Sequence, residues 1–236
     1  MKNMLKKLFV GKNLVILLIF SLFLSEIFLS FNETIGFLLY GFLIALCLIS
    51  LSHIKILNDY GKLIIILMII PIIRVSGLFI NLGLFWETLI FYCLLLFLAF
   101  YYSVRFKLDH GHKKEKLDLL PLAVIIGVVL GLIGQGFFNF ENYSWIIYLI
   151  PLIAYSEEIL FRGMIQNLVE KSYGVIPSIF IPAFLYGFFS LGYGYLFALF
   201  MFFAGIILGL VYYKTKNIFL TVVINMILHY LLFVLG

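Results

Sequence analysis

Charged side chains are scarce in this sequence. Aspartate, glutamate, lysine and arginine together make up 11% of its 236 residues, whereas 65% of the residues are hydrophobic. A soluble domain carries about 25% charged and about 45–50% apolar residues. Because the chain has too few polar residues to cover its apolar ones in water, the composition excludes a soluble globular protein and predicts an integral membrane protein.

Cysteine and clustered positive charge are scarce as well. The two cysteines, Cys47 and Cys93, stand singly in apolar runs, so we expect them to pack among other side chains rather than to form a disulfide or bind a metal. The net charge of +5 comes from basic residues that are dispersed between apolar runs. This dispersal argues against a nucleic-acid-binding surface and leaves the lipid bilayer as the expected surrounding.

Long apolar runs, joined by short polar segments, occupy most of the chain. A membrane-spanning helix needs about 20 mostly apolar residues. We therefore predict an all-α fold, a polytopic membrane helix bundle with eight or nine spans, the lower number applying if one of the short late segments is re-entrant. The candidate spans are residues 13–31, 35–54, 63–81, 85–105, 119–136, 145–169, 175–193, 196–213 and 217–235.

The basic residues predict how these spans are oriented. We call the short segments between spans joints. Fourteen of the 16 lysines and arginines lie at the N-terminus or in alternate joints, and the joints near 32–34, 82–84, 137–144 and 194–195 hold none. Cytoplasmic joints carry an excess of lysine and arginine. We therefore expect the N-terminus inside the cell, and we expect the polar stretch 106–118 to be a cytoplasmic loop.

Three charges interrupt the span predicted for residues 145–169. Glu157, Glu158 and Arg162 lie there in the segment Tyr155–Gly163, and each charge at the bilayer centre costs about 2.5–3.5 kcal/mol on insertion scales. Glu158 and Arg162 are four residues apart in the order that favours an ion pair, which would brace the helix. Glu157 points roughly 100° away from this face, so we expect it to face a cavity.

Polar residues of two later spans are predicted at a similar depth. Tyr186 and Ser190 share one helical face, as do Asn225 and His229. At about 1.5 Å per residue, Ser190 and His229 lie roughly 18–20 Å from the cytoplasmic end, as Glu158 does. We predict one pocket for these residues and Glu157, reached from the cytoplasm. Spacing alone leaves open whether the pocket performs chemistry or is a buried polar network that locks the bundle.

Three further charges lie within earlier spans. Arg74 falls in the third span and Glu26 in the first, while Glu87 begins the fourth. We interpret Arg74 as one half of a structural ion pair with one of these glutamates; lining of a cavity is the alternative.

The segment Glu157-Glu158-x-x-x-Arg162-Gly163 resembles the first motif of the CPBP intramembrane proteases, also called the CAAX protease and bacteriocin-processing (Abi) family. Residues 180–191 resemble the second motif, and residues 205–209 with 215–229 resemble the last two helices of that family. The resemblance divides the chain into N-terminal spans, about five, over residues 1–144 and a family-like core of about four helices over residues 145–236. Both parts would form one integrated membrane domain.

The resemblance implies an intramembrane endopeptidase in which Glu157 activates water. The family's later motifs contain histidine and asparagine, which bind the water or stabilise the oxyanion. This sequence departs from them, because Ser190 and Asn225 hold the histidine positions and His229 holds the asparagine position. The candidate catalytic residues are therefore Glu157, Glu158, Ser190, Asn225 and His229, with Arg162 and Tyr186 as a brace.

Zinc is not expected, although the family has been labelled metalloprotease, because a catalytic zinc needs three protein ligands and His229 is the single intramembrane histidine of this region. We therefore predict no cofactor. The expected partner is a membrane-associated peptide or protein, in the cytoplasmic membrane of a prokaryote.

Two alternatives to proteolysis stay open. One is a catalytically silent family member with a binding, bacteriocin-immunity or accessory role. The other is a transporter that uses the buried charges as a proton path, although no inverted repeat supports it.

Overall fold

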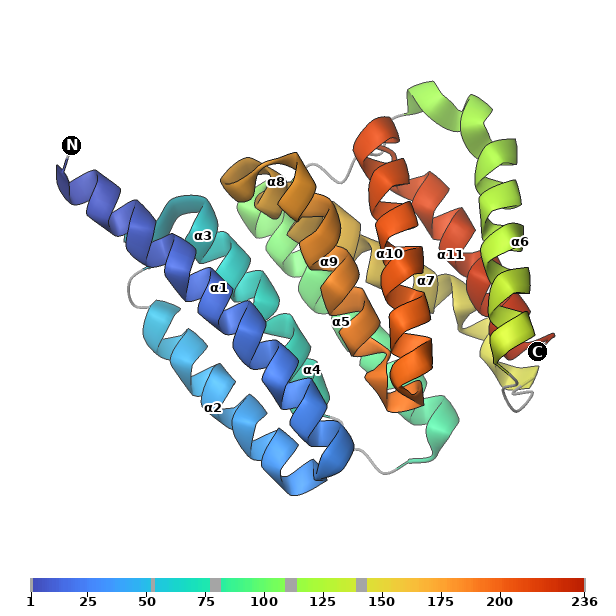
Figure 1. Cartoon of the computed structure of the whole chain (residues 1–236), viewed down its shortest axis with the longest axis horizontal. Coiled ribbons are helices and arrows are strands. Elements are labelled where there is room, and N and C mark those ends of the chain that lie inside the picture. The colour runs from blue at the N-terminus through green and yellow to red at the C-terminus, as the bar shows by residue number, and fades with distance from the viewer. Residues whose placement is uncertain (1, 52–53, 77–81, 109–113, 139–143, 236) are drawn as a thin grey trace.

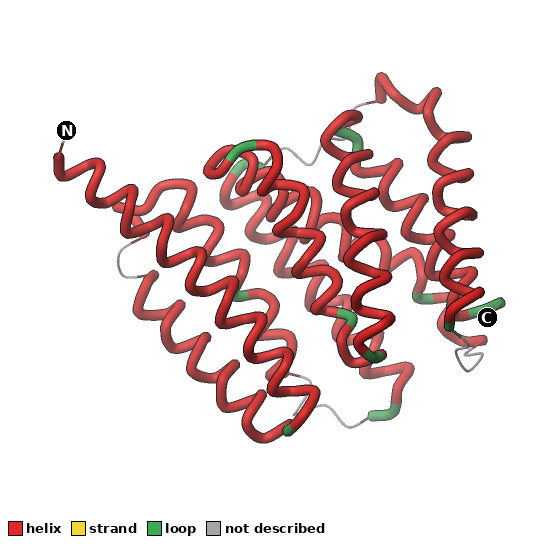
Figure 2. Tube along the Cα trace, viewed as in Figure 1, coloured by secondary structure: helices red, strands yellow, loops and turns green. Residues whose placement is uncertain are grey.

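The computed structural model describes residues 2–51, 54–76, 82–108, 114–138 and 144–235, and every regular element in these ranges is a helix (Figures 1 and 2). This confirms the predicted all-α class. The helices are α1 (Lys2–Phe31), α2 (Glu33–Leu51), α3 (Ile54–Leu67), α4 (Ile69–Ser76), α5 (Leu84–Phe106), α6 (Leu120–Phe137), α7 (Ile150–Glu158), α8 (Asn167–Tyr173), α9 (Val175–Phe189), α10 (Tyr195–Thr215) and α11 (Ile218–Phe233). A π-helix, Ile159–Gln166, joins α7 to α8, and the short 3₁₀ segments Lys114–Leu119, Ser144–Tyr148 and Leu191–Tyr193 precede α6, α7 and α10.

The predicted spans fall on these helices. By length and composition, four segments are suited to cross a membrane, namely Gly11–Phe31, Leu84–Phe106, Lys116–Phe137 and Tyr195–Thr215. Three shorter apolar helices are Glu33–Ile49, Val175–Phe189 and Ile218–Phe233. The spans predicted at 63–81 and 145–169 are interrupted helices, because α3 ends at Leu67 and α7 changes into the π-helix at Ile159. Residues 52–53 and 77–81 of the predicted spans, and 109–113 of the predicted loop, lie outside the described residues.

The helix ends gather at two opposite ends of the bundle. At one end, the hydroxyl of Tyr173 donates to the carbonyl oxygen of Lys12 at 3.0 Å, and Nζ of Lys116 donates to the carbonyl oxygen of Lys214 at 2.7 Å. We call this the basic end, at the top of Figure 1. The basic residues of this end include Lys12, Arg105, Lys107, Lys116, Lys171, Lys214 and Lys216.

The opposite end, at the bottom of Figure 1, holds the joints without lysine or arginine, and we call it the lysine-free end. There the hydroxyls of Ser30 and Tyr195 lie 3.0 Å apart, which ties the end of α1 to the start of α10. The rings of Phe85 and Trp145 pack edge to face, with centroids 5.6 Å apart. As far as the structure describes them, the two kinds of joint inferred from the sequence therefore lie at opposite ends of the molecule.

Glycines allow the last helices to pack closely. A Cβ atom added at Gly187 in α9 would lie 2.7 Å from the carbonyl oxygen of Ala198 in α10, and one at Gly205 would lie 3.0 Å from Cα of Ala183. On α6, Gly127, Gly131 and Gly134 face α11 in the same way. Small residues at such positions let helix backbones approach closely in a membrane. This packing brings α9 close to α10 and α6 close to α11.

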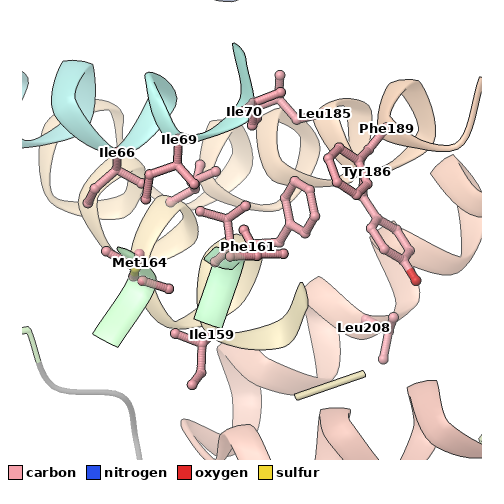
Figure 3. Close-up of a cluster of buried hydrophobic side chains, with 14 of the residues drawn as sticks. Ile66, Ile69, Ile70, Ile159, Phe161, Met164, Leu185, Tyr186, Phe189 and Leu208 are labelled. Carbon is pink, nitrogen blue, oxygen red and sulfur yellow. The ribbon is translucent and has the colours of Figure 1, made fainter. Parts of the chain in front are cut away.

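An apolar cluster anchors the π-helix on its other side. Figure 3 shows Ile66 and Ile69, from α3 and α4, near Phe161 and Met164 of the π-helix, and all four side chains are fully buried. Single π turns within helices occur frequently at functional sites. Here the π-helix begins directly after Glu158, so the N-terminal helices also position the charged segment.

Candidate active site

Glu158 and Arg162 form a buried ion pair where α7 meets the π-helix. Nη1 of Arg162 lies 2.9 Å from Oε1 of Glu158, and both side chains are 0% exposed. This confirms the ion pair predicted from their spacing. Nη2 of Arg162 also donates to the carbonyl oxygen of Gly205 in α10 at 3.3 Å, and the guanidinium carbon lies 4.7 Å from the ring centroid of Tyr186. Arg162 therefore connects its own helix to α9 and α10.

The carboxylate of Glu157 is the point at which four helices meet. Oε1 accepts a hydrogen bond from the hydroxyl of Tyr92 in α5 at 3.0 Å. Oε2 lies 3.1 Å from Nδ2 of Asn225 and 3.1 Å from Nε2 of His229, both in α11, and 3.3 Å from the hydroxyl of Tyr186 in α9. Glu157 is 3% exposed, so these contacts replace nearly all of the water that would surround the carboxylate in solution.

Asn225 is fully engaged in holding the two glutamates. Its Nδ2 donates to Oε2 of Glu157 at 3.1 Å and to Oε1 of Glu158 at 3.2 Å, and its Oδ1 accepts from Tyr186 at 2.9 Å. A side-chain amide has two N–H donors, and both are used here. Asn225 thus orients the carboxylates, whereas the sequence had suggested a hydrogen bond to the oxyanion.

Ser190 lies in the wall of the same cavity without touching Glu157. Its hydroxyl donates to the backbone carbonyl oxygen of Tyr186 at 3.2 Å, one turn earlier in the chain. The structure therefore brings Glu157, Glu158, Asn225 and His229 into direct contact and places Ser190 beside them.

A cavity of about 1090 Å³ leads to Glu157 and His229. Its walls come from both parts of the chain, including Arg74 of α4, Phe91 of α5 and Phe197 of α10. It extends to the lysine-free end, where Glu33, Leu84, Gly192 and Tyr195 are among the lining residues.

The prediction that the pocket opens toward the basic joints is therefore wrong. A residue about 20 Å from one end of a bundle is near its middle, so depth does not tell which end is open. Toward the basic end, the buried side chains of Arg162, Gln166 and Asn225 fill the space behind Glu157.

Arg74 forms the predicted structural ion pair with Glu26. Its Nε lies 2.9 Å from Oε1 of Glu26, and its Nη2 donates to the carbonyl oxygen of Phe189 at 2.7 Å. Both charged residues also line the cavity. Arg74 therefore forms a structural ion pair and lines the cavity as well. Glu87 instead accepts from the backbone N–H groups of Leu82 and Gly83 at the start of α5.

Tyr92 is the site residue that the sequence did not reveal. It lies in a predicted span without any charged neighbour or recognised motif. A tyrosine in an apolar helix is ordinarily a packing residue, so only the three-dimensional contact with Glu157 identifies it. No spacing pattern within α5 would have distinguished Tyr92 from Tyr101 or Tyr102.

The donor set does not fit a catalytic zinc. Within the residues that the structure describes, no group of three or more His, Cys, Asp or Glu side chains is placed to hold a metal ion. Glu157 and His229 would supply two ligands, whereas a catalytic zinc takes three from the protein and keeps one open position. Glu158 is committed to Arg162.

A match to one known protein family covers the part of the chain that contains these residues. Residues 139–231 match the family model described as Type II CAAX prenyl endopeptidase Rce1-like, and this range contains Glu157, Glu158, Ser190, Asn225 and His229. No curated protein and no solved structure matches the chain. The match bears out the resemblance inferred from the motifs, and residues 139–231 are similar to the Rce1-like type II CAAX prenyl endopeptidases.

Proposed function

We propose that this chain is an intramembrane endopeptidase in which Glu157 activates water to hydrolyse a peptide bond of a membrane-associated protein or peptide. The observation that carries the proposal is the position of Glu157 beside His229 at the inner end of the cavity. The family match supports this kind of reaction.

Glu157 has room to bind the attacking water. A carboxylate oxygen offers two acceptor positions, and among the described residues Tyr92 fills one of those on Oε1. A water held at the other position would add its oxygen to the carbonyl carbon while its proton passes to Glu157. The C–N bond would then break as Glu157 returns that proton to the leaving nitrogen, giving a carboxylic acid and an amine.

His229 is suited to stabilise the negative charge of the intermediate. Its Nδ1 is buried and has no hydrogen-bond partner among the described residues, while the residue lines the cavity. When both ring nitrogens are protonated, Nε2–H donates to Glu157 and Nδ1–H is left for the oxyanion. One such donor contributes about 2.7–4 kcal/mol to transition-state stabilisation.

The other residues would hold these two groups in place. Tyr92, Tyr186 and Asn225 orient the carboxylate of Glu157, and the Glu158–Arg162 pair braces the helix. Ser190 has no contact with a base among the described residues, so we assign it to the cavity wall rather than to a nucleophile.

A catalytically silent binding protein is the second candidate. It is favoured by the residues at the motif positions, where Ser190 and Asn225 replace histidine, and by the complete engagement of the Asn225 amide. Such a protein would hold a peptide in the same cavity without cleaving it, as an immunity or accessory protein for bacteriocins would require.

A cleavage assay tests the proposal. The full chain is reconstituted in liposomes with internally quenched apolar peptides, one series unmodified and one ending in a prenylated cysteine within a CAAX box, and the products are identified by mass spectrometry. We expect cleavage by the wild type and by Asp118→Asn, an exposed carboxylate change outside the cavity, but not by Glu157→Gln. Binding of peptide without cleavage would support the silent alternative instead.

A further inference from the structure

The mouth of the cavity lies at the lysine-free end of the molecule. The lining residues at this end include Ser30 at the end of α1, Glu33 at the start of α2, Leu84 at the start of α5 and Gly192 before α10. Leu84 is 61% exposed and Tyr195, on the same rim, is 57% exposed. The cavity is therefore open where these joints meet.

The opposite side of the catalytic group is closed. Arg162, Gln166 and Asn225 are 0% exposed and lie behind Glu157, and Phe161 packs beside them with the same burial. Among the described residues of the basic end, none lines the cavity. A substrate can thus approach Glu157 along the cavity but not through the layer that faces the lysines and arginines.

The distribution of charge decides which end faces the cytoplasm. Joints rich in lysine and arginine stay on the cytoplasmic side of a membrane. Where the structure describes such joints, they belong to the end at which no residue lines the cavity. We propose that the cavity opens on the extracytoplasmic side of the membrane, so that the substrate enters from outside the cell or from the outer leaflet.

This inference deepens the proposed function and rests on it where the substrate is concerned. A cavity of about 1090 Å³ is at or above the upper end of the range for drug-sized ligands, about 300–1,000 Å³. It is lined by apolar and aromatic side chains such as Phe37, Phe91 and Phe197. The expected substrate is an apolar peptide segment that has already crossed the membrane, in contrast to the C-terminus of a cytosolic protein.

Single-cysteine labelling tests the side of access without any need for activity. Cys47 and Cys93 are replaced by alanine, and one cysteine is introduced at the mouth as Gly192→Cys or at the basic end as Lys171→Cys. A Cβ atom at Gly192 meets no atom within 4 Å, and Lys171 is exposed. Intact cells are treated with a membrane-impermeant maleimide before and after permeabilisation.

We expect the Gly192→Cys chain to be labelled in intact cells and the Lys171→Cys chain only after permeabilisation. The reverse pattern would overturn the inference, and so would a Gly192→Cys chain that reacts only after detergent extraction. A bulky maleimide attached at Gly192→Cys should also block peptide cleavage, whereas one at Lys171→Cys should not. If the wild-type chain cleaves nothing, the proposed function fails, while the labelling result still decides the side of access.

Discussion

Nε2 of His229 lies 3.1 Å from Oε2 of Glu157, across the contact between α11 and α7. The two residues are 72 positions apart in the chain, and each occupies a separate apolar helix. The carboxylate and the imidazole form a pair at the inner end of the cavity, and the remaining Nδ1 of His229 has no partner among the described residues.

Replacing His229 should remove the proposed oxyanion donor. We expect His229→Ala to lower the cleavage rate by about 10²–10³-fold, the loss that follows removal of one such donor. Tyr230→Ala is the matched control, because Tyr230 is the next residue in α11 and is 37% exposed. Equal rates for the two variants would show that His229 has no part in the chemistry.

Removing the hydroxyl of Tyr92 should weaken the orientation of Glu157. A hydrogen bond to a charged group is worth about 1.5–3 kcal/mol, so Tyr92→Phe should slow cleavage by about 10–100-fold. Tyr101→Phe removes a hydroxyl from the exposed face of the same helix and should leave the rate unchanged. A rate for Tyr92→Phe that matches this control would mean that the contact in α5 is only structural.

The Glu158–Arg162 pair should stabilise the fold strongly. Taking away one partner of a buried ion pair costs about 3–5 kcal/mol, because the other charge stays buried alone. Arg162→Met should therefore lower the free energy of unfolding by this amount, measured by denaturant titration in detergent. The double variant Glu158→Leu, Arg162→Met should lose less than the sum of the two single variants. Additive losses would contradict a direct pair.

Because α9 packs closely against α10 at Gly187, the substitution Gly187→Ala should destabilise the fold. Its added Cβ atom would lie 2.7 Å from a backbone oxygen of α10, and overpacking of this kind costs about 1–3 kcal/mol. Gly41 in α2 has no atom within 4 Å of an added Cβ, so Gly41→Ala should be neutral or stabilising by about 0.5–1 kcal/mol. A comparison of thermal unfolding midpoints checks both, and equal midpoints would contradict the packing argument.

The sequence was sufficient for the features that depend on local pattern. The length of the apolar runs predicted the helices, and the four-residue spacing of Glu158 and Arg162 predicted their ion pair. The same spacing on α11 predicted that Asn225 and His229 share a face. The similar depth of these residues in separate helices then predicted that Asn225 and His229 lie close to Glu157. The distances of 3.1 Å from Nδ2 of Asn225 and Nε2 of His229 to Oε2 of Glu157 confirm this.

Features that depend on the packing of distant helices were not predictable in this way. Tyr92 carries no charge and lies in an apolar run, so nothing in α5 marked it as a partner of Glu157. The end at which the cavity opens depends on how the helices pack near Gly192, which lines the cavity. It also depends on the buried side chains, such as Gln166, that close the other end. Distances counted along single helices do not contain that information.

The most direct test of the central claim separates peptide binding from peptide cleavage in Glu157→Gln. The substitution keeps the shape of the side chain but removes the base, and general-base catalysis contributes about 10²–10⁴-fold. The claim predicts that the single-turnover rate of cleavage of the quenched peptide falls at least about 10²-fold. The dissociation constant of the peptide should stay unchanged. Cleavage by Glu157→Gln at the wild-type rate would contradict it.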